Sequence, residues 1–347
     1  MHYFLIILFH KRKVKVHMMK QQFIFGLAIL LLMILLPLVS LQEASGQKQE
    51  ARETTSARQP EAPPAAAPAD PREENGETIQ VVRSASGKTE TLAMREYLVG
   101  CVAAEMDANN HLEALKAQAV ASYTYARYRR EIGGREALSD SGKSDQGYDD
   151  ARRRGERWGG NSELYEAKIG QAVDAVLGQT ITYEGQPTFA AYSALSGGKT
   201  ESAANYWGDD FAYLRSVESP GDKLSPDYSK TVTLQPEEVK KTLEKAEGVK
   251  LGKDPAAWFG KPQRSEAGAV TEIAVGGKTL SGRAVRELLE LRSAHFTIEH
   301  KNGAFEIKCL GYGHGVGMSQ YGADFMARQG SDYKEILEHY YAGCVVT

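Results

Sequence analysis

An uncharged run of 19 residues, Phe23 to Leu41, divides this chain of 347 residues into unlike parts. As an α-helix the run would be about 28 Å long, which is enough to cross the hydrocarbon core of a bilayer. The residues before it carry five positive charges and no acid: Lys11, Arg12, Lys13, Lys15 and Lys20. Positive residues flank the cytoplasmic end of a membrane span. We therefore predict a short basic cytoplasmic head over 1–22, a single-pass transmembrane anchor over 23–41, and the remainder of the chain outside the cell membrane.

A cleaved signal peptide is the alternative interpretation of this run. Its apolar region would be shorter, about 7–15 residues, and would end in a small-x-small cleavage site. The sequence LVSLQEASG that closes the run is a poor site of this kind, and no Cys follows it for lipid attachment. The sequence therefore favours an uncleaved anchor. Met18 and Met19 remain alternative starts to Met1.

Residues 42–77 have the composition of a tether. They hold five of the twelve prolines, four basic and eight acidic side chains, and almost nothing large and apolar. Such a segment buries too little surface to offset the entropy lost on ordering. We predict a disordered Pro/Ala/Glu-rich tether that joins the anchor to a globular domain over 78–347.

Composition limits what this domain can be. The first two parts carry +5 and −4, so the net charge of −3 for the whole chain leaves −4 for 78–347. A chain that is not basic is a poor candidate for general nucleic-acid binding. With 42% apolar and 25% charged residues the chain is not disordered as a whole, and three cysteines are too few for a disulfide scaffold. The string Gly-Lys-Thr occurs three times, but the upstream glycine of a phosphate loop is missing each time, which excludes that nucleotide site.

Hydrophobic periodicity predicts an α+β fold for 78–347. We expect hairpins near 78–93 and 270–280, further strands at 179–184, 188–195, 212–217, 295–300 and 304–310, and a loop over 132–160. We expect helices at 94–106, at 112–130 with Asn110 and Glu113 as a capping box, at 165–177, after Pro236, at 282–291 with Ser281 as its cap, at 318–329 and at 332–342. Strands and helices mix without regular βαβ alternation, which favours one α+β domain, or two subdomains flanking a cleft.

Glu105 is the most informative candidate for chemistry. On the predicted helix it follows Leu98 by seven residues, Cys101 by four and Val102 by three, so it lies on the apolar stripe, where a charge is costly. An apolar setting raises the pKa of a carboxyl group and keeps its proton available for general acid catalysis. The alternative is a glutamate at a helix end that turns to solvent or pairs with Lys116.

Two further segments combine polar side chains with glycines. In AAYSALSGGKTE, residues 190–201, the hydroxyls and the cation of Tyr192, Ser196, Lys199 and Thr200 surround a glycine turn and could bind a polar, anionic polymer. In GYGHGVGMSQYGA, residues 311–323, alternating glycines allow a ligand or another backbone to approach closely, next to His314, Gln320 and Tyr321. A polar hairpin turn and a structural glycine corner are the alternatives.

Metal and thiol chemistry are poorly supported by the sequence. It contains no HExxH and no CxxC, and His111, His295, His300, His314 and His339 show no ligand spacing. Cys101 acting as a nucleophile with His314 is an alternative, but a lone Cys on an apolar helix face usually belongs to the core. We expect no metal and no cofactor.

Five strings together resemble the stage II sporulation protein D family: MREYLVGCVAAEM, LEALKAQAVASYTYAR, AYSALSGGKTE, YLRSVESPGD and GHGVGMSQYGA. They cover most of 78–347. The resemblance implies a membrane-anchored lytic transglycosylase that cleaves the glycan strands of peptidoglycan during forespore engulfment, in the engulfing membrane of the mother cell. It implies that Glu105 is the catalytic acid, and that stage II sporulation proteins P and M are partners, with P removing stem peptides first.

This chain departs from the pattern at one point. Some family members hold zinc through Cys and His ligands in the loop after the long helix, whereas ALSDSGKSDQGYDDARRR has neither residue. The sequence therefore predicts no zinc. Related domains in amidase enhancers act as binding modules, so a non-catalytic glycan-binding module and a structural tether of the engulfment complex stay open beside the enzyme.

The topology can be tested with reporter fusions. Because five cations precede the uncharged run and none follows it directly, a reporter at Met1 should lie in the cytoplasm and one at Thr347 outside. Recovery of a mature protein that begins near Ala44, free in the medium, would contradict the anchor.

Overall fold

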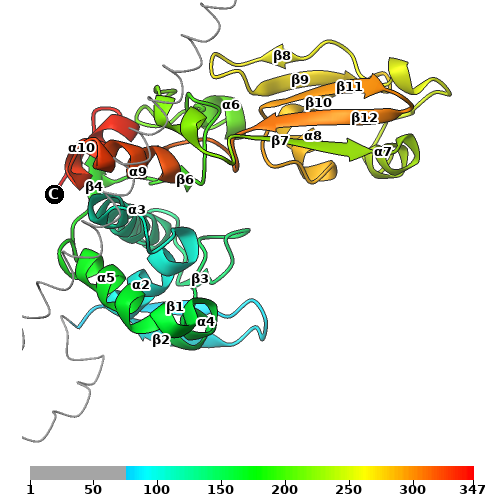
Figure 1. Ribbon diagram of the computed structural model, residues 1–347. Helices are drawn as coiled ribbons and strands as arrows, with labels where there is room; N and C mark the ends of the chain where they lie inside the picture. The colour runs from blue at the N-terminus through cyan, green and yellow to red at the C-terminus, as the bar shows by residue number, and fades with distance from the viewer. Residues whose placement is uncertain (1–75) are drawn as a thin grey trace, which may run out of the picture. The chain divides into compact units, whose positions relative to one another are not determined.

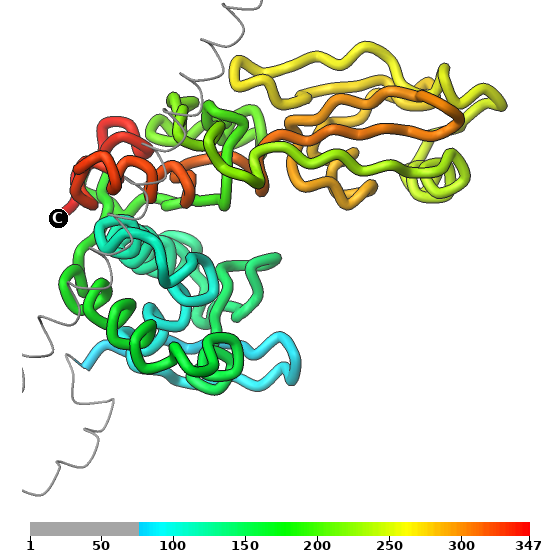
Figure 2. Tube along the Cα trace, viewed as in Figure 1, coloured from blue at the N-terminus to red at the C-terminus, as the bar shows by residue number. Residues whose placement is uncertain are grey.

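The computed structural model describes residues 76–347, which are organised around two hydrophobic cores (Figure 1). Buried residues of the first core come from 79–214 and 316–344, and those of the second from 239–309. The chain thus leaves the first core, builds the second and returns, as the order of colours in Figure 2 shows. The mixture of strands and helices without βαβ alternation confirms the predicted α+β class.

The predicted anchor lies outside the described residues, and so does the tether apart from its last two residues. Within residues 76–347 no helix combines the length and the apolar character needed to cross a membrane.

Helices dominate the first core. They are α2 (Met94–Glu105), α3 (Leu112–Glu131), α4 (Ala151–Trp158), α5 (Ser162–Asp174), α6 (Ala203–Trp207), α9 (Gln320–Arg328), α10 (Tyr333–Tyr340) and the short 3₁₀ turns η1 (Gly159–Asn161) and η2 (Pro220–Leu224). Three small sheets accompany them: β2 (Thr89–Ala93), β1 (Thr78–Val82) and β3 (Ala137–Ser139); β14 (Val345–Val346), β4 (Ile181–Tyr183) and β5 (Gln186–Pro187); and the parallel pair β6 (Tyr192–Ser193) and β13 (Met318–Ser319).

Helix α3 is the centre of the first core. Twelve of its 20 residues are buried, most of them alanine, serine or threonine, and small side chains let α2, α5, α9 and α10 pack closely around it. The His111 side chain caps the helix by accepting the backbone N–H of Glu113 at 3.3 Å. The predicted Asn110 cap is therefore wrong by one residue. The backbone N–H of Asn110 instead closes a turn on the carbonyl of Asp107.

Two antiparallel sheets and two helices form the second core. The strands are β11 (Phe296–Lys301), β12 (Ala304–Leu310) and β7 (Ser229–Leu234) in one sheet, and β10 (Lys278–Ser281), β9 (Val270–Val275) and β8 (Gln263–Arg264) in the other. The helices are α7 (Pro236–Leu243) and α8 (Gly282–Leu288), with the 3₁₀ turn η3 (Pro255–Ala257). Ser281 caps α8 by accepting the N–H of Ala284, as predicted.

Most of the predicted elements form, and two predictions in the first core are wrong. No strand forms at 212–217, and the predicted loop over 132–160 contains β3 and α4. The α4 sequence ARRRGERW has no apolar stripe, so periodicity could not reveal it. Charged contacts attach this helix to its neighbours, together with the packing of Trp158 at its end against the first core.

Arg154 makes the main attachment of α4. Its side chain is 2% exposed and pairs with Glu166 of α5 at 2.6 Å and with Glu96 of α2 at 3.1 Å. It also donates to the carbonyl of Asp149 at 2.9 Å. One buried guanidinium thus joins three elements of the first core.

Replacing Arg154 by alanine should cost about 2–4 kcal/mol of stability, because two carboxylates and a carbonyl lose their donor. Arg152→Ala on the same helix is the matched control. Arg152 is exposed, and Glu156 one turn away is its one ion-pair partner within residues 76–347, so its loss should cost no more than about 0.5 kcal/mol. Denaturant unfolding of both variants measures the difference, and equal costs would show that Arg154 does not anchor α4.

Candidate active site

Glu105 is the last residue of α2, and its side chain extends from a buried face of this helix. Leu98, Cys101 and Val102, which the sequence pattern placed on the same stripe, are at most 1% exposed. Glu105 itself is partly buried, and its Oε1 accepts the backbone N–H of Gly147 at 2.7 Å. A Cβ atom on Gly147 would lie 2.9 Å from Oε1, so glycine at this position allows the contact.

Residues 140–149, called here the 140s loop, bring Gly147 to Glu105. The buried carboxylate of Asp145 holds this loop. It accepts the backbone N–H of Ser139 at 2.8 Å and pairs with Arg129 and Arg135 at 3.2 Å each. Further along, the N–H of Asp149 donates to the carbonyl of Gly100 in α2 at 3.1 Å. The loop is thereby fixed at its middle and at its end against neighbouring segments of the first core.

A chain of buried amides connects Glu105 to the rest of the site. Gln320 Nε2 lies 3.5 Å from Glu105 Oε2 and donates to Gln118 Oε1 at 3.2 Å. Gln118 donates to Ser122 Oγ at 3.0 Å, and the carbonyl of Ser122 accepts from Gln146 at 3.2 Å. Tyr192 completes the chain by donating its hydroxyl proton to Gln146 Oε1 at 2.7 Å. These bonds fix the orientation of each side chain around the carboxyl group.

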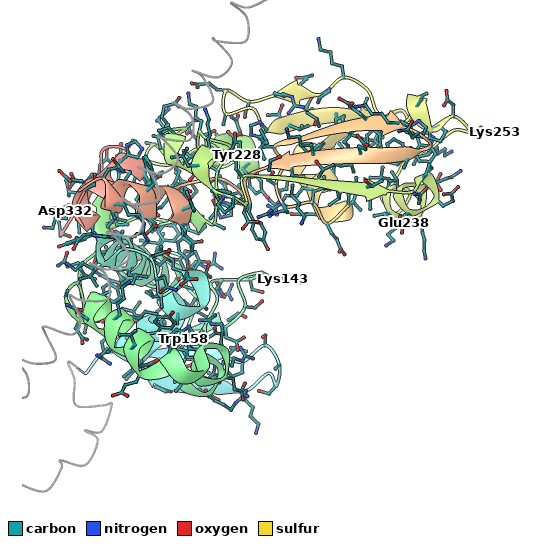
Figure 3. All side chains as sticks on the ribbon, viewed as in Figure 1. Lys143, Trp158, Tyr228, Glu238, Lys253 and Asp332 are labelled. Carbon is teal, nitrogen blue, oxygen red and sulfur yellow. The ribbon has the colours of Figure 1, made fainter. Side chains whose placement is uncertain are left out.

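A pocket of about 410 Å³ opens in front of Glu105. Its lining residues are Glu105, Tyr125, Arg129, Gly142, Lys143, Ser144, Asp145, Gln146, Phe189, Ala190, Ala191, Tyr192, Ser193, Tyr206, Trp207, Arg283, Arg286, Glu287, Gly313 and His314. Figure 3 shows Lys143 at the tip of the 140s loop. Phe189, Tyr206 and Trp207 supply apolar ring faces, and the remaining lining is rich in polar groups. A polar ligand with apolar faces, such as a sugar, suits this combination.

Two lining residues have buried polar atoms without a hydrogen-bond partner within residues 76–347. They are Ser193 Oγ and Arg129 Nε. Buried polar groups in proteins are almost always paired, so two exceptions beside one pocket support a ligand or water site there.

Burial sets the protonation of the site. It raises the pKa of Glu105, against the lowering effect of the bonds from Gly147 and Gln320, and nearby Asp149 raises it further. Burial, aided by Arg286, lowers the pKa of His314 to about 4, so the imidazole is neutral at pH 7. Its Nδ1 accepts the N–H of Val316 at 3.0 Å. The site thus offers a carboxyl group that retains its proton to higher pH than usual, beside a neutral histidine.

The structure gathers four of the predicted site residues. Glu105, Tyr192 and His314 line the pocket together, and Gln320 contacts Glu105 from behind. The other four do not line this pocket. Ser196 is buried and bonds to Asp222, and Thr200 is buried and bonds to Val217. Lys199 pairs with Glu266 and Glu218, and it lines with Ser196 a small adjoining cavity that shares His314 with the pocket. Tyr321 does not line the pocket, and its backbone N–H donates to Ala194.

The glycines of 311–323 make room for the protein's own backbone. A Cβ atom on Gly317 would meet the carbonyl oxygen of Ala191 at 2.0 Å, and one on Gly313 would meet Ser193 Cβ at 2.8 Å. The sequence pattern allowed either a ligand or another backbone to approach these glycines. In the structure, the backbone of the 190–201 segment approaches them. The two glycine-rich segments therefore brace each other and present Tyr192 and His314 to the pocket.

Sequence reasoning missed Gln146 and Gly147 in the 140s loop, Tyr206 and Trp207 of α6, and the arginines of α8. None of them belongs to a motif, and only the folded chain brings them to the pocket. The Cys101 alternative loses support, because its thiol is fully buried and burial raises its pKa well above the ordinary value. Within residues 76–347 no group of three or more His, Cys, Asp or Glu side chains is arranged to hold a metal ion.

The chain is similar to several known proteins. Residues 83–183 match the family described as Stage II sporulation protein. The chain is 38% identical to Stage II sporulation protein D of Bacillus subtilis, over 78% of this chain and 79% of that protein. It is 37% identical to the protein of the same name from Bacillus amyloliquefaciens, over 77% of each. It is also 27% identical to the amidase enhancer of Bacillus subtilis, over 72% of this chain and 40% of that protein.

The burial of Glu105 predicts a pH-dependent effect of Glu105→Gln on stability. A carboxyl group whose pKa is raised on folding favours the folded state below its unfolded pKa of about 4.3 and loses that contribution as the pH rises through the folded value. The variant should therefore gain stability relative to the wild type between pH 4 and pH 8. Unfolding experiments at the two pH values, with the exposed Glu247→Gln as control, measure this gain. A loss of relative stability over the same interval would contradict the burial of the carboxyl group.

Proposed function

Because the chain belongs to the stage II sporulation protein D family, a family of sporulation proteins, we propose that it is a lytic transglycosylase of peptidoglycan. The substrate is the glycosidic bond between N-acetylmuramic acid and N-acetylglucosamine. One observation carries the proposal. Of the carboxylates that line the pocket, Asp145 pairs with arginines and Glu287 pairs with Arg283, while Glu105 has no cationic partner within residues 76–347. This difference supports Glu105, among these three carboxylates, as the group that keeps and transfers a proton.

The reaction needs one carboxyl group acting twice. Glu105 protonates the glycosidic oxygen, the bond from this oxygen to C1 of the muramic ring breaks, and positive charge develops at C1. The resulting carboxylate then takes the proton from the 6-hydroxyl of the same ring, and O6 bonds to C1 to close a 1,6-anhydro ring. Because no water attacks, a second carboxylate is not required, which agrees with a pocket that has one unpaired acid.

In the proposed mechanism the other residues of the pocket have supporting roles. Gly147 N–H and Gln320 hold the carboxyl group in place, and their bonds stabilise its ionised form after the first proton transfer. Trp207 and Tyr206 offer ring faces for sugar stacking. Tyr192 donates to Gln146, so its hydroxyl oxygen keeps lone pairs that accept from a sugar hydroxyl.

Cellular context extends this proposal. The sequence pattern favours an anchor over 23–41 in the engulfing membrane of the mother cell. The catalytic domain would then lie outside the cytoplasm. The family resemblance also supports joint action with stage II sporulation proteins P and M. In this arrangement an amidase removes stem peptides and the transglycosylase then cuts the bare glycan.

Product analysis after substitution tests the mechanism. Glu105→Gln is nearly isosteric but cannot give or take the proton, so it should reduce the rate on peptide-stripped glycan by at least about 10²–10⁴-fold. Mass analysis of wild-type digests should show 1,6-anhydromuramic ends and no new reducing ends. Glu287→Gln is the matched control, a paired carboxylate of the same pocket, and is expected to keep the anhydro product. Reducing ends in the wild-type digest, or loss of the product in Glu287→Gln, would show that a second acid takes part.

The relative named amidase enhancer supports a second candidate, a glycan-binding module that stimulates an amidase without cleaving glycan itself. The two functions differ in their need for Glu105. A Glu105→Gln protein that still binds glycan and supports engulfment, with unchanged glycan products, would favour the binding module.

A further inference from the structure

Helix α8 of the second core contributes to the pocket an arginine, Arg286, that has no acidic partner within residues 76–347. Three α8 residues line it: Arg283, Arg286 and Glu287. Arg283 and Glu287 pair with each other at 2.8 Å, one turn apart. Arg286 donates to the hydroxyl of Tyr206 at 2.6 Å and to the carbonyl of Leu291 at 3.3 Å, and no carboxylate within residues 76–347 pairs with it. Its charge is therefore not neutralised by the described part of the protein.

The surroundings of Arg286 hold it at the pocket. Tyr206, its hydrogen-bond partner, belongs to α6 of the first core, and the Tyr206 ring also contacts His314, with 5.8 Å between centroids. His314 is neutral at pH 7, so the arginine and not the histidine supplies positive charge to this wall. A partly buried, oriented guanidinium without an acidic partner is the group that binds carboxylates in proteins, often through two parallel hydrogen bonds.

We propose that Arg286 binds the carboxylate of the lactyl ether on the muramic acid ring whose glycosidic bond Glu105 cleaves. This inference rests on the proposed function. In intact peptidoglycan the lactyl group is joined to the stem peptide by an amide bond and carries no charge. Hydrolysis of that amide releases a carboxylate. Arg286 thus makes the enzyme selective for glycan already processed by an amide hydrolase, and it is a specificity-determining residue of the site.

Two polymers that differ in one group isolate this contact. The first is peptide-stripped glycan with free lactyl carboxylates, and the second is the same glycan with those carboxylates converted to primary amides. The wild type should cleave the carboxylate form with a kcat/KM about 10- to 100-fold higher, the range expected for one charge-assisted contact. Arg286→Gln should abolish this preference by slowing only the carboxylate form, and Arg286→Lys should restore part of it.

Arg292→Gln is the matched control. Arg292 lies six residues after Arg286, pairs with Asp227 and does not line the pocket. Arg292→Gln changes the net charge by the same amount as Arg286→Gln and should leave the preference for the carboxylate form intact. Thermal unfolding checks that each variant is folded. A third arm uses glycan with intact stem peptides. If Arg286 instead recognises a peptide carboxylate, Arg286→Gln will slow cleavage of this polymer, and the proposal is wrong.

Binding measurements separate this inference from the proposed function. The affinities of Glu105→Gln and of Glu105→Gln/Arg286→Gln for the two polymers report the same contact without turnover. The wild type could prove inactive on glycan and still bind the carboxylate form more tightly than the amide form, through Arg286. This result would overturn the proposed transglycosylase activity and support the carboxylate-binding role of Arg286. Equal affinity for the two polymers, or a preference that survives the loss of Arg286, would overturn the subsite and leave the transglycosylase standing.

Discussion

The hydrogen bond from the backbone of Gly147 to Glu105 is the contact on which the architecture of the site depends. A carboxyl group at the edge of a hydrophobic core must find donors there, or remain protonated and easily displaced. The 140s loop meets this need only because Asp145 fixes the loop and Gly147 has no side chain. The amide of Gln320 approaches the other oxygen from α9. Three segments far apart in the sequence thus define the position and the protonation of one side chain.

Another buried carboxylate, that of Asp222, organises the glycine-rich segments behind the pocket. Asp222 is fully buried, and it accepts the backbone N–H of Ser196 at 2.9 Å and the hydroxyl of Ser319 at 2.7 Å. Burial raises the pKa of Asp222, while these donors lower it. Asp222 joins the turn after β6 to the start of α9. Hydroxyls that resemble a binding surface in the sequence are in this way used to hold two loops together.

The sequence predicted the parts of this protein that follow local rules. Glu105 could be singled out because helical spacing put it in line with Leu98 and Val102, and the Ser281 cap and the hairpins around it have local signatures. The role of Ser196 could not be inferred, because the sequence around a serine does not show whether its hydroxyl is buried or binds a substrate. Arg286 is the opposite case, a pocket residue that the sequence did not single out. It looks like an ordinary surface charge of a helix, and only the folded chain brings Tyr206 and His314 to it from segments before and after the second core.

The interruption of the first core by the second also affects the order in which the protein can form. Buried residues from 316–344, among them Val316, Met318, Tyr340 and Tyr341, complete a core whose other half lies before residue 215. The second core is a contiguous stretch and can assemble while the first still lacks its closing helices. During synthesis, Glu105 and Gly147 are therefore made long before Gln320 and His314 exist to complete the site. A partly synthesised chain therefore lacks the side chains that 311–323 contributes to the candidate site, so the site is complete only once the synthesis of this segment is finished.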